Sequence, residues 1–131
     1  IYTLSLHDAL PIYELLDGHT AAVFVKFRKH PTKDELVGAL RNYSGEPQTL
    51  KLPSAPAQFI QYLEDDDRPQ VAKDVGFENG MGISIGRLRE DRVYDWKFVG
   101  LSHNTLRGAA GGGVEAAEYL CAKGYIEPKE A

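Results

Sequence analysis

Two strand-like runs separated by a charged turn constrain the fold of this 131-residue chain most strongly. The runs are GMGISIGRLR and VYDWKFVGL, and Glu90–Asp91 form the turn between them. Ile83 and Ile85 alternate with small residues in the first run. Three aromatic residues share one face of the second run: Tyr94, Trp96 and Phe98. Because alternation with a period of two is typical of half-buried strands, both runs are predicted to be strands of one sheet.

The segment before these runs predicts a strand followed by a helix. Apolar and basic side chains alternate in TAAVFVKFRK, which is typical of a strand. In TKDELVGALRNYSG, Thr32 and Glu35 have the spacing of a capping box, which marks the start of a helix. We expect Gly45 to end that helix. Prolines then recur over residues 46–69, which predicts an extended connection with an edge strand around Phe59–Leu63.

A final helix is predicted from Asn104 to about Lys123, where Gly124 ends it. Four glycines lie in its first half: Gly108, Gly111, Gly112 and Gly113. Each glycine inside a helix costs roughly 0.5–1 kcal/mol relative to alanine, so something has to approach that backbone closely. The complete order is strand, helix, extended connection, two strands and helix. This order predicts an α+β fold, a mostly antiparallel sheet with helices on one face.

Composition excludes several classes of function. The net charge of −4 and the scattered lysines and arginines indicate no nucleic-acid-binding surface. No apolar run approaches the roughly 20 residues that a membrane-spanning helix needs. A single cysteine, Cys121, excludes an internal disulfide and a cysteine-rich metal site, so we expect a cytoplasmic protein. The acidic run Glu64–Asp67 lacks the spacing of a calcium loop and predicts a solvated loop.

Four side chains could carry chemistry, and each also has a simpler interpretation. We interpret Cys121 as a buried packing residue and not as a nucleophile. His30 precedes a proline at a strand end and is expected on a loop surface. His103 neighbours Asn104, and a surface or supporting role is the simpler interpretation. His19 stands just before a strand, where an imidazole could act as a general acid or base, with an ordinary strand-end histidine as the alternative.

Four longer blocks carry a family resemblance: DGHTAAVFVKF, LKLPSAPAQFIQYLEDDDRPQ, GMGISIGRLRED and YDWKFVGLSHNTLRGAAGGGV. In this order and at compatible spacing, they resemble aspartate-semialdehyde dehydrogenase of the fungal and archaeal type. The resemblance runs from about Leu15 to Ile126 and matches only the C-terminal part of that enzyme. It implies a catalytic and dimerisation domain similar to that of glyceraldehyde-3-phosphate dehydrogenase. It also implies that the final helix returns to a nucleotide-binding Rossmann domain.

The reaction implied by this resemblance is NADP-dependent. It interconverts L-aspartate 4-semialdehyde plus phosphate and 4-phospho-L-aspartate, in lysine, methionine and threonine biosynthesis, and the full-length enzyme is implied to be a homodimer or homotetramer. His19 matches the family's acid/base histidine, and Asn104 matches the position that contacts the cofactor near its nicotinamide end. The position of the arginine that binds the substrate carboxylate holds Ile12 in this chain. The nucleophilic cysteine and the glycine-rich NADP loop have no counterpart, so we expect a fragment that is inactive alone.

The resemblance divides the chain into three parts. Residues 1–12 resemble a translated sequencing adapter and are expected to be non-native, a short natural lead-in strand being the alternative. Residues 13–103 correspond to a portion of the catalytic and dimerisation domain, and residues 104–131 to the returning helix. No metal is implied.

The glycines of the last helix then have two explanations. We expect unpaired backbone N–H groups at its start to face the cofactor cleft, and the glycines to make room for the nucleotide domain or the cofactor. A close crossing of the helix over a strand inside this domain is the alternative. The second hypothesis for the whole chain is a non-catalytic α+β module that binds a small molecule or dimerises through the aromatic face of Tyr94, Trp96 and Phe98.

Overall fold

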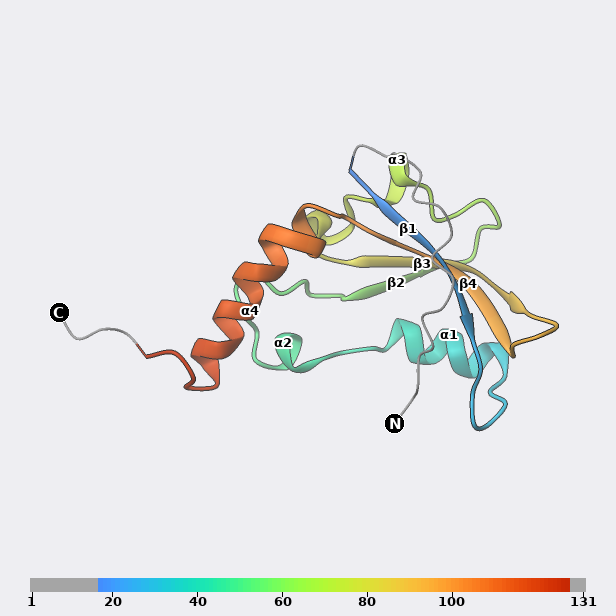
Figure 1. Ribbon diagram of the computed structural model, residues 1–131, viewed down its shortest axis with the longest axis horizontal. Coiled ribbons are helices and arrows are strands. Elements are labelled where there is room, and N and C mark those ends of the chain that lie inside the picture. Colours follow the sequence, from blue (N-terminus) through green and yellow to red (C-terminus); the bar gives the residue numbers. More distant parts are fainter. Residues whose placement is uncertain (1–16, 128–131) are drawn as a thin grey trace.

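The computed structural model describes residues 17–127, so the expectations for residues 1–12, Ile12 included, lie outside the described residues. The elements follow in this order: β1 (His19–Val25), α1 (Lys33–Arg41), α2 (Glu46–Thr49), β2 (Ile60–Leu63), α3 (Val71–Asp74), the turn η1 (Phe77–Gly80), β3 (Ile83–Glu90), β4 (Trp96–Ser102), the π-turn η2 (Leu106–Ala110) and α4 (Gly111–Ala122). Figure 1 shows one sheet with α1 and α2 on the same side and α4 beside one end. Within residues 17–127, no helix is long and apolar enough to cross a membrane.

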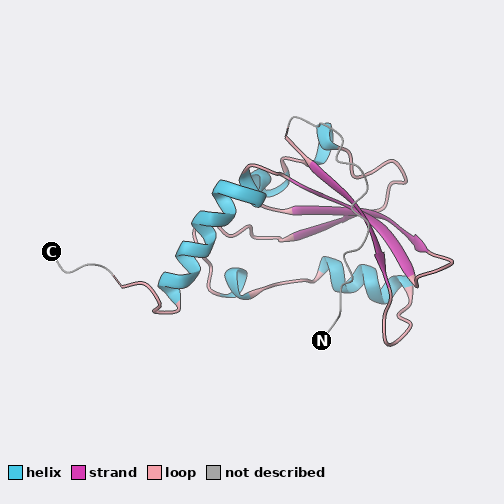
Figure 2. Ribbon diagram, in the orientation of Figure 1, coloured by secondary structure: helices cyan, strands magenta, loops and turns pink. Residues whose placement is uncertain are grey.

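The sheet has four strands in the order β1-β4-β3-β2. The β1–β4 and β3–β4 pairs are antiparallel, and only the β2–β3 pair is parallel, which is the mostly antiparallel sheet that the sequence predicts. Figure 2 shows the four strands as one twisted layer. The predicted edge strand is present as β2, at the edge next to β3. Prolines flank it because a proline cannot donate to a strand ladder.

The hydrophobic core lies between α1 and one face of the sheet. Its buried members are Val37, Tyr62, Ile85, Leu88 and Trp96. The indole Nε1 of Trp96 donates to the carbonyl of Pro31 at 3.1 Å, and this bond ties the start of α1 to β4. Phe98 packs against the same cluster.

The prediction of a shared aromatic face on the second run is wrong for Tyr94. Trp96 and Phe98 are directed into the core, whereas Tyr94 precedes β4 and lies 6.0 Å, ring centroid to ring centroid, from Phe24. Phe24 pairs with Lys97 in the β1–β4 register, and this pair lies on the sheet face opposite to the core because strand side chains alternate. Trp96 and Phe98 therefore share the core face, and Tyr94 does not lie with them.

The capping box of α1 is confirmed, but its predicted end is not. The Thr32 N–H donates to Glu35 Oε2 at 2.7 Å, and the Glu35 N–H donates to Thr32 Oγ1 at 3.3 Å. The helix ends at Arg41 because the backbone N–H and the side-chain amide of Asn42 both bond to the Gly38 carbonyl, at 3.0 and 2.8 Å. Gly45 lies beyond this end and starts α2 instead.

The acidic run between β2 and α3 is exposed throughout, as predicted for a solvated loop. Further along the chain, Asp74 at the end of α3 is buried. Its carboxylate accepts hydrogen bonds from the Arg68 guanidinium and from the Gln70 N–H. The guanidinium, together with that N–H, lowers the pKa of Asp74. These bonds hold α3 against the sheet face opposite to the core, where Ser84 Oγ donates to the Asp74 carbonyl at 3.2 Å.

Candidate functional site

His19 is the first residue of β1, and its side chain is exposed. In the β1–β4 register it stands opposite Ser102, the last residue of β4. The preceding residue, Gly18, is buried, and a Cβ there would lie 2.9 Å from Val71 of α3 and 3.3 Å from Leu101 of β4. This close packing fixes the backbone at the start of β1. The histidine is therefore an exposed imidazole on a rigid support.

Asn104 is exposed and lies two residues after Ser102, the register partner of His19. The antiparallel register therefore places His19 and Asn104 at the same end of the sheet, although the whole length of the fold separates them in sequence. His30, which follows β1, is exposed as predicted, and its Nδ1 lies 3.2 Å from Asp95 Oδ1 near the opposite end of β1.

His103 has the supporting role that was one of its two simpler interpretations. Its Nδ1 accepts the backbone N–H groups of Thr105 at 3.3 Å and Leu106 at 3.2 Å. The expectation of unpaired N–H groups at the start of the last helix is wrong for these two groups, because the imidazole reaches forward and caps them. Sequence reasoning missed this cap, since histidine is not among the usual capping residues.

The four glycines at the start of the last helix do not share one explanation. It begins as the π-turn η2 and becomes α-helical only at Gly111. A Cβ on Gly111 would meet the sulfur of Met81 and lie 2.9 Å from the Leu106 carbonyl oxygen. A Cβ on Gly112 would meet the Arg107 carbonyl oxygen. Both glycines thus avoid a clash with a carbonyl of the π-turn itself, and Gly111 also avoids one with Met81, which lies between η1 and β3. Neither contact is the close strand crossing that was the alternative explanation.

The other two glycines have room around them. A Cβ on Gly108 would come no closer than 3.6 Å to the His103 carbonyl oxygen, and a Cβ on Gly113 would meet nothing within 4 Å. The described residues give no reason for a glycine at either position. Space for the nucleotide domain or the cofactor stays a prediction for Gly108 and Gly113.

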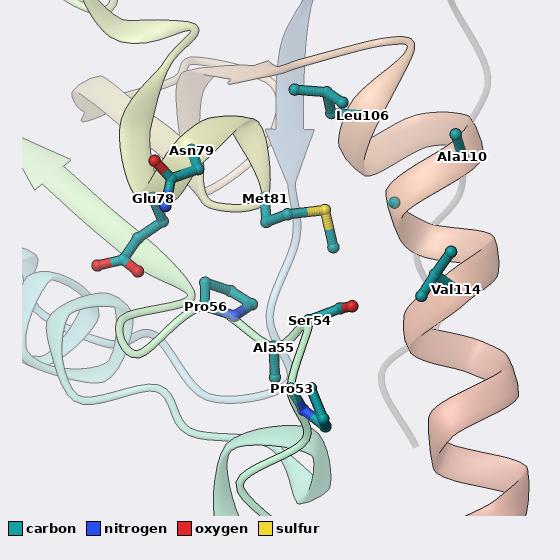
Figure 3. A pocket seen from close by; sticks show the side chains of 11 residues that line it. Pro53, Ser54, Ala55, Pro56, Glu78, Asn79, Met81, Leu106, Ala110 and Val114 are labelled. Atoms are coloured by element: carbon teal, nitrogen blue, oxygen red, sulfur yellow. The ribbon is translucent and has the colours of Figure 1, made fainter.

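A pocket of about 400 Å³ lies between α4, η1 and the loop before β2 (Figure 3). It is lined by Pro53, Ser54, Ala55, Pro56, Glu78, Asn79, Met81, Leu106, Ala110, Gly111 and Val114. Figure 3 shows Met81 extending toward α4. Two adjacent lining residues, Glu78 and Asn79, have left-handed φ values of 51° and 56°. Neither His19 nor Asn104 lines this pocket, so it is separate from the predicted site.

Polar pairs fasten α4 to the rest of the domain. Ser54 donates from its N–H at 2.9 Å and from its hydroxyl at 2.8 Å to the Glu118 carboxylate. The Tyr119 hydroxyl donates to Glu46 of α2, and Lys123 Nζ lies 3.1 Å from the same carboxylate. The tyrosine hydroxyl and the ammonium lower the pKa of Glu46 and, in return, the carboxylate raises the pKa of Tyr119.

The interpretation of Cys121 as a buried residue is wrong, because its side chain is exposed. The bonds of α4 to α2 and to the Ser54 loop come from Glu118, Tyr119 and Lys123, and Cys121 is not among these contacts. Val114 and Leu120 are exposed as well, at 53% and 39%. Among residues 17–127, these two apolar side chains of α4 are therefore only partly covered.

The comparison with protein families agrees with this geometry. Residues 14–107 match the family described as semialdehyde dehydrogenase, dimerisation domain. The chain belongs to this family. The family resemblance drawn from the four sequence blocks is thereby confirmed, and so is the α+β fold expected from it.

Individual relatives are longer than this chain. It is 47% identical over 115 residues to aspartate-semialdehyde dehydrogenase of Schizosaccharomyces pombe, covering 86% of this chain and 32% of that protein. It is also 41% identical over 116 residues to malonyl CoA reductase (NADP) of Metallosphaera sedula, covering 87% of this chain and 32% of that protein. The chain thus spans about a third of the length of these relatives.

A solved structure extends the comparison to three dimensions. Aspartate semialdehyde dehydrogenase with NADP from Candida albicans superposes with a TM-score of 0.74 at 40% identity, over 86% of this chain and 32% of that one. The fold described here is therefore that of the corresponding part of a dehydrogenase.

Proposed function

We propose that this chain is the C-terminal catalytic and dimerisation part of an NADP-dependent aspartate-semialdehyde dehydrogenase. The observation that carries the proposal is that His19 and Asn104 lie at the same end of the sheet. Both residues stand at positions that match the family's motifs, and the β1–β4 register brings them to one end of the sheet. Identity of 47% to the Schizosaccharomyces pombe enzyme supports the choice of substrate.

His19 is proposed to transfer protons. The nucleophilic thiol belongs to the part of the enzyme that precedes this chain, and it attacks the aldehyde carbon of the substrate. His19 takes the proton from that thiol or from the hydroxyl of the hemithioacetal, and it returns the proton in the reverse direction. An exposed imidazole that follows the tightly packed Gly18 is suited to this task, because the backbone at Gly18 is fixed while the ring is open to a substrate.

Asn104 is proposed to contact the cofactor, and the described residues fit that role. NADP⁺, when bound, accepts the hydride from the substrate. The Asn104 side chain is exposed, and its amide offers both a donor and an acceptor to a carboxamide. The nearby Gly108 adds no bulk, and the His103 cap fixes the backbone that follows Asn104. The phosphate-binding residues and the glycine-rich loop would come from the preceding nucleotide-binding part.

The family description also points to a homo-oligomer, and we propose a second copy of this chain as the partner. The sheet face opposite to the core carries Phe24 and Tyr94, which are 40% and 41% exposed. The exposed side chain of Leu120 in α4 is proposed to contact the nucleotide-binding part instead. Such an enzyme would work in the cytoplasm.

A second candidate substrate follows from the malonyl CoA reductase of Metallosphaera sedula, which is 41% identical to this chain. That protein's name indicates a coenzyme A thioester where the first candidate uses an acyl phosphate. His19 would serve either reaction, since both pass through a thiol adduct of an aldehyde.

A fusion tests the proposed function. Residues 13–131 would replace the corresponding C-terminal third of the Schizosaccharomyces pombe enzyme, to which this chain aligns over 115 residues. We expect the fusion to reduce NADP⁺ when given aspartate 4-semialdehyde and phosphate, and the chain alone to show no turnover. A folded fusion that lacks this activity, but oxidises NADPH with malonyl-CoA, would favour the second candidate. A fusion inactive with both would contradict the proposal.

A further inference from the structure

We propose that Arg107 and Glu115 form a positioning pair, which holds the π-turn η2 and through it keeps Asn104 in place beside the cofactor. The effect on the cofactor rests on the proposed function, whereas the effect on the π-turn does not. Both residues lie in the last helical segment, and the sequence patterns assign neither of them a role.

The pair joins three segments of the chain. Arg107 belongs to η2, and its Nη1 forms an ion pair with Oε2 of Glu115, two helical turns further on in α4. The guanidinium also stacks on Phe59, with its Cζ 4.7 Å from the ring centroid, just before β2. The side chains of Arg107 and Glu115 are only 25% and 6% exposed. The pair therefore lies beneath the start of α4 and not on the surface.

Stability alone is a poor explanation for this pair. Removing two charges from water is costly, and apolar side chains of similar volume often stabilise a fold as well or better. Glu115 Oε1 is buried and has no hydrogen-bond partner among the described residues, which adds to the cost. The guanidinium is, however, held from two sides, by the single bond from Nη1 to Glu115 and by its stacking on Phe59, and together these contacts fix its orientation. We infer that the pair fixes the position of η2.

The turn connects directly to the candidate site. His103 caps the N–H groups of Thr105 and Leu106, and the Arg107–Glu115 pair holds the next residue. Asn104 lies inside the loop that the His103 cap closes, and Arg107 directly follows this loop. A π-turn inside a helix is strained relative to an α-helical turn and is frequent at functional sites. Releasing one attachment should let the turn relax and move the Asn104 amide.

Hydrogen exchange on the 131-residue chain tests the first half of the proposal. The variants are Arg107→Lys, which keeps the charge but loses the planar fork, and Glu115→Gln. The matched control is Glu118→Gln, which weakens the bonds to Ser54 but leaves the turn intact. We expect amides over residues 105–110 to exchange at least about tenfold faster in the first two variants, with β1 unchanged.

An equal acceleration in the Glu118 control would overturn the proposal, because it would show general loosening of α4. Unchanged exchange over residues 105–110 in both variants of the pair would overturn it as well. These outcomes do not depend on whether the chain comes from a dehydrogenase.

The second half is tested by NADP⁺ affinity in the Schizosaccharomyces pombe fusion. We expect Arg107→Lys to weaken NADP⁺ binding by roughly tenfold, the effect of losing one hydrogen bond, with little change in KM for the semialdehyde. Asn104→Ala should weaken binding by a similar factor, and combining the two changes should add little. Full NADP⁺ affinity in Arg107→Lys, measured beside a weakened Asn104→Ala, would overturn the link to the cofactor. An unmodified fusion that binds no NADP⁺ would contradict the proposed function and this link together, and the exchange result would still decide the role in the turn.

Discussion

Alanine at Gly111 and at Gly113 should change stability in opposite directions. Both residues lie in α4, two positions apart, so both substitutions add the same methyl group to the same helix. Around Gly113 the new Cβ meets nothing within 4 Å, whereas at Gly111 it meets Met81 and lies 2.9 Å from the Leu106 carbonyl oxygen. The pair of variants therefore separates helix propensity from close packing.

The magnitudes follow from these surroundings. Gly113→Ala should stabilise the chain by about 0.5–1 kcal/mol, the usual gain of alanine over glycine in a helix. Gly111→Ala gains the same propensity but adds an overpacking cost of about 1–3 kcal/mol, because a backbone carbonyl cannot move aside as Met81 can. Propensity cancels in the comparison, so Gly111→Ala should be less stable than Gly113→Ala by about 1–3 kcal/mol.

Urea unfolding followed by tryptophan fluorescence provides the assay. Trp96 is the only tryptophan and is buried in the core, so its emission reports global unfolding. A change in midpoint at constant slope gives the difference in free energy of unfolding. Equal stabilisation by the two alanines would refute the close approach of Met81 and Leu106 to Gly111. Destabilisation by Gly113→Ala would show that space around that residue is not open.

Three further predictions concern the cap, a turn and the exposed thiol. His103→Ala should destabilise the chain by about 1 kcal/mol, as loss of a helix cap does, and His103→Asn should recover part of it in the same urea assay. N–H groups of Val93 and Tyr94 and the Lys97 ammonium lower the pKa of Asp91 from 3.8 to about 2. Its contribution to stability is therefore complete above about pH 4 and is lost as the pH falls through 2, so Asp91→Asn should flatten the acid limb of a stability-versus-pH curve. A thiol-specific reagent should modify Cys121 in the folded chain as fast as in urea, and protection would contradict its exposure.

Local patterns predicted the elements well where neighbours in sequence determine them. The capping box at Thr32 and Glu35 and the alternation that became β3 depend on side chains a few residues apart, so the sequence shows them directly. The end of α1 was predicted at Gly45, but the helix ends earlier, before Asn42. The side-chain amide of Asn42 bonds back to the Gly38 carbonyl and ends the helix there. Such competition between nearby polar groups has no simple pattern in sequence.

For the candidate site, too, the sequence predicted some features and missed others. Motif resemblance selected His19 and Asn104, and the register of β1 with β4 placed them together, which no local pattern could have predicted. The contact of Met81 with Gly111 joins segments that are distant in sequence. The ion pair of Glu115 with Arg107 joins an α-helical turn to a π-turn, so neither contact follows from a local pattern. The π-turn itself was invisible, because its sequence reads as the first turn of an ordinary helix.

The proton-transfer role of His19 is the central claim, and kcat of the fusion enzyme tests it most directly. His19→Asn is compared with His30→Asn, a second exposed histidine beyond the other end of β1. We predict that His19→Asn lowers kcat by about 10²–10⁴, the usual weight of a general acid or base, and that His30→Asn leaves kcat unchanged. A His19→Asn enzyme with unchanged kcat and only a raised KM would contradict the account, because the imidazole would then bind the substrate without moving its proton.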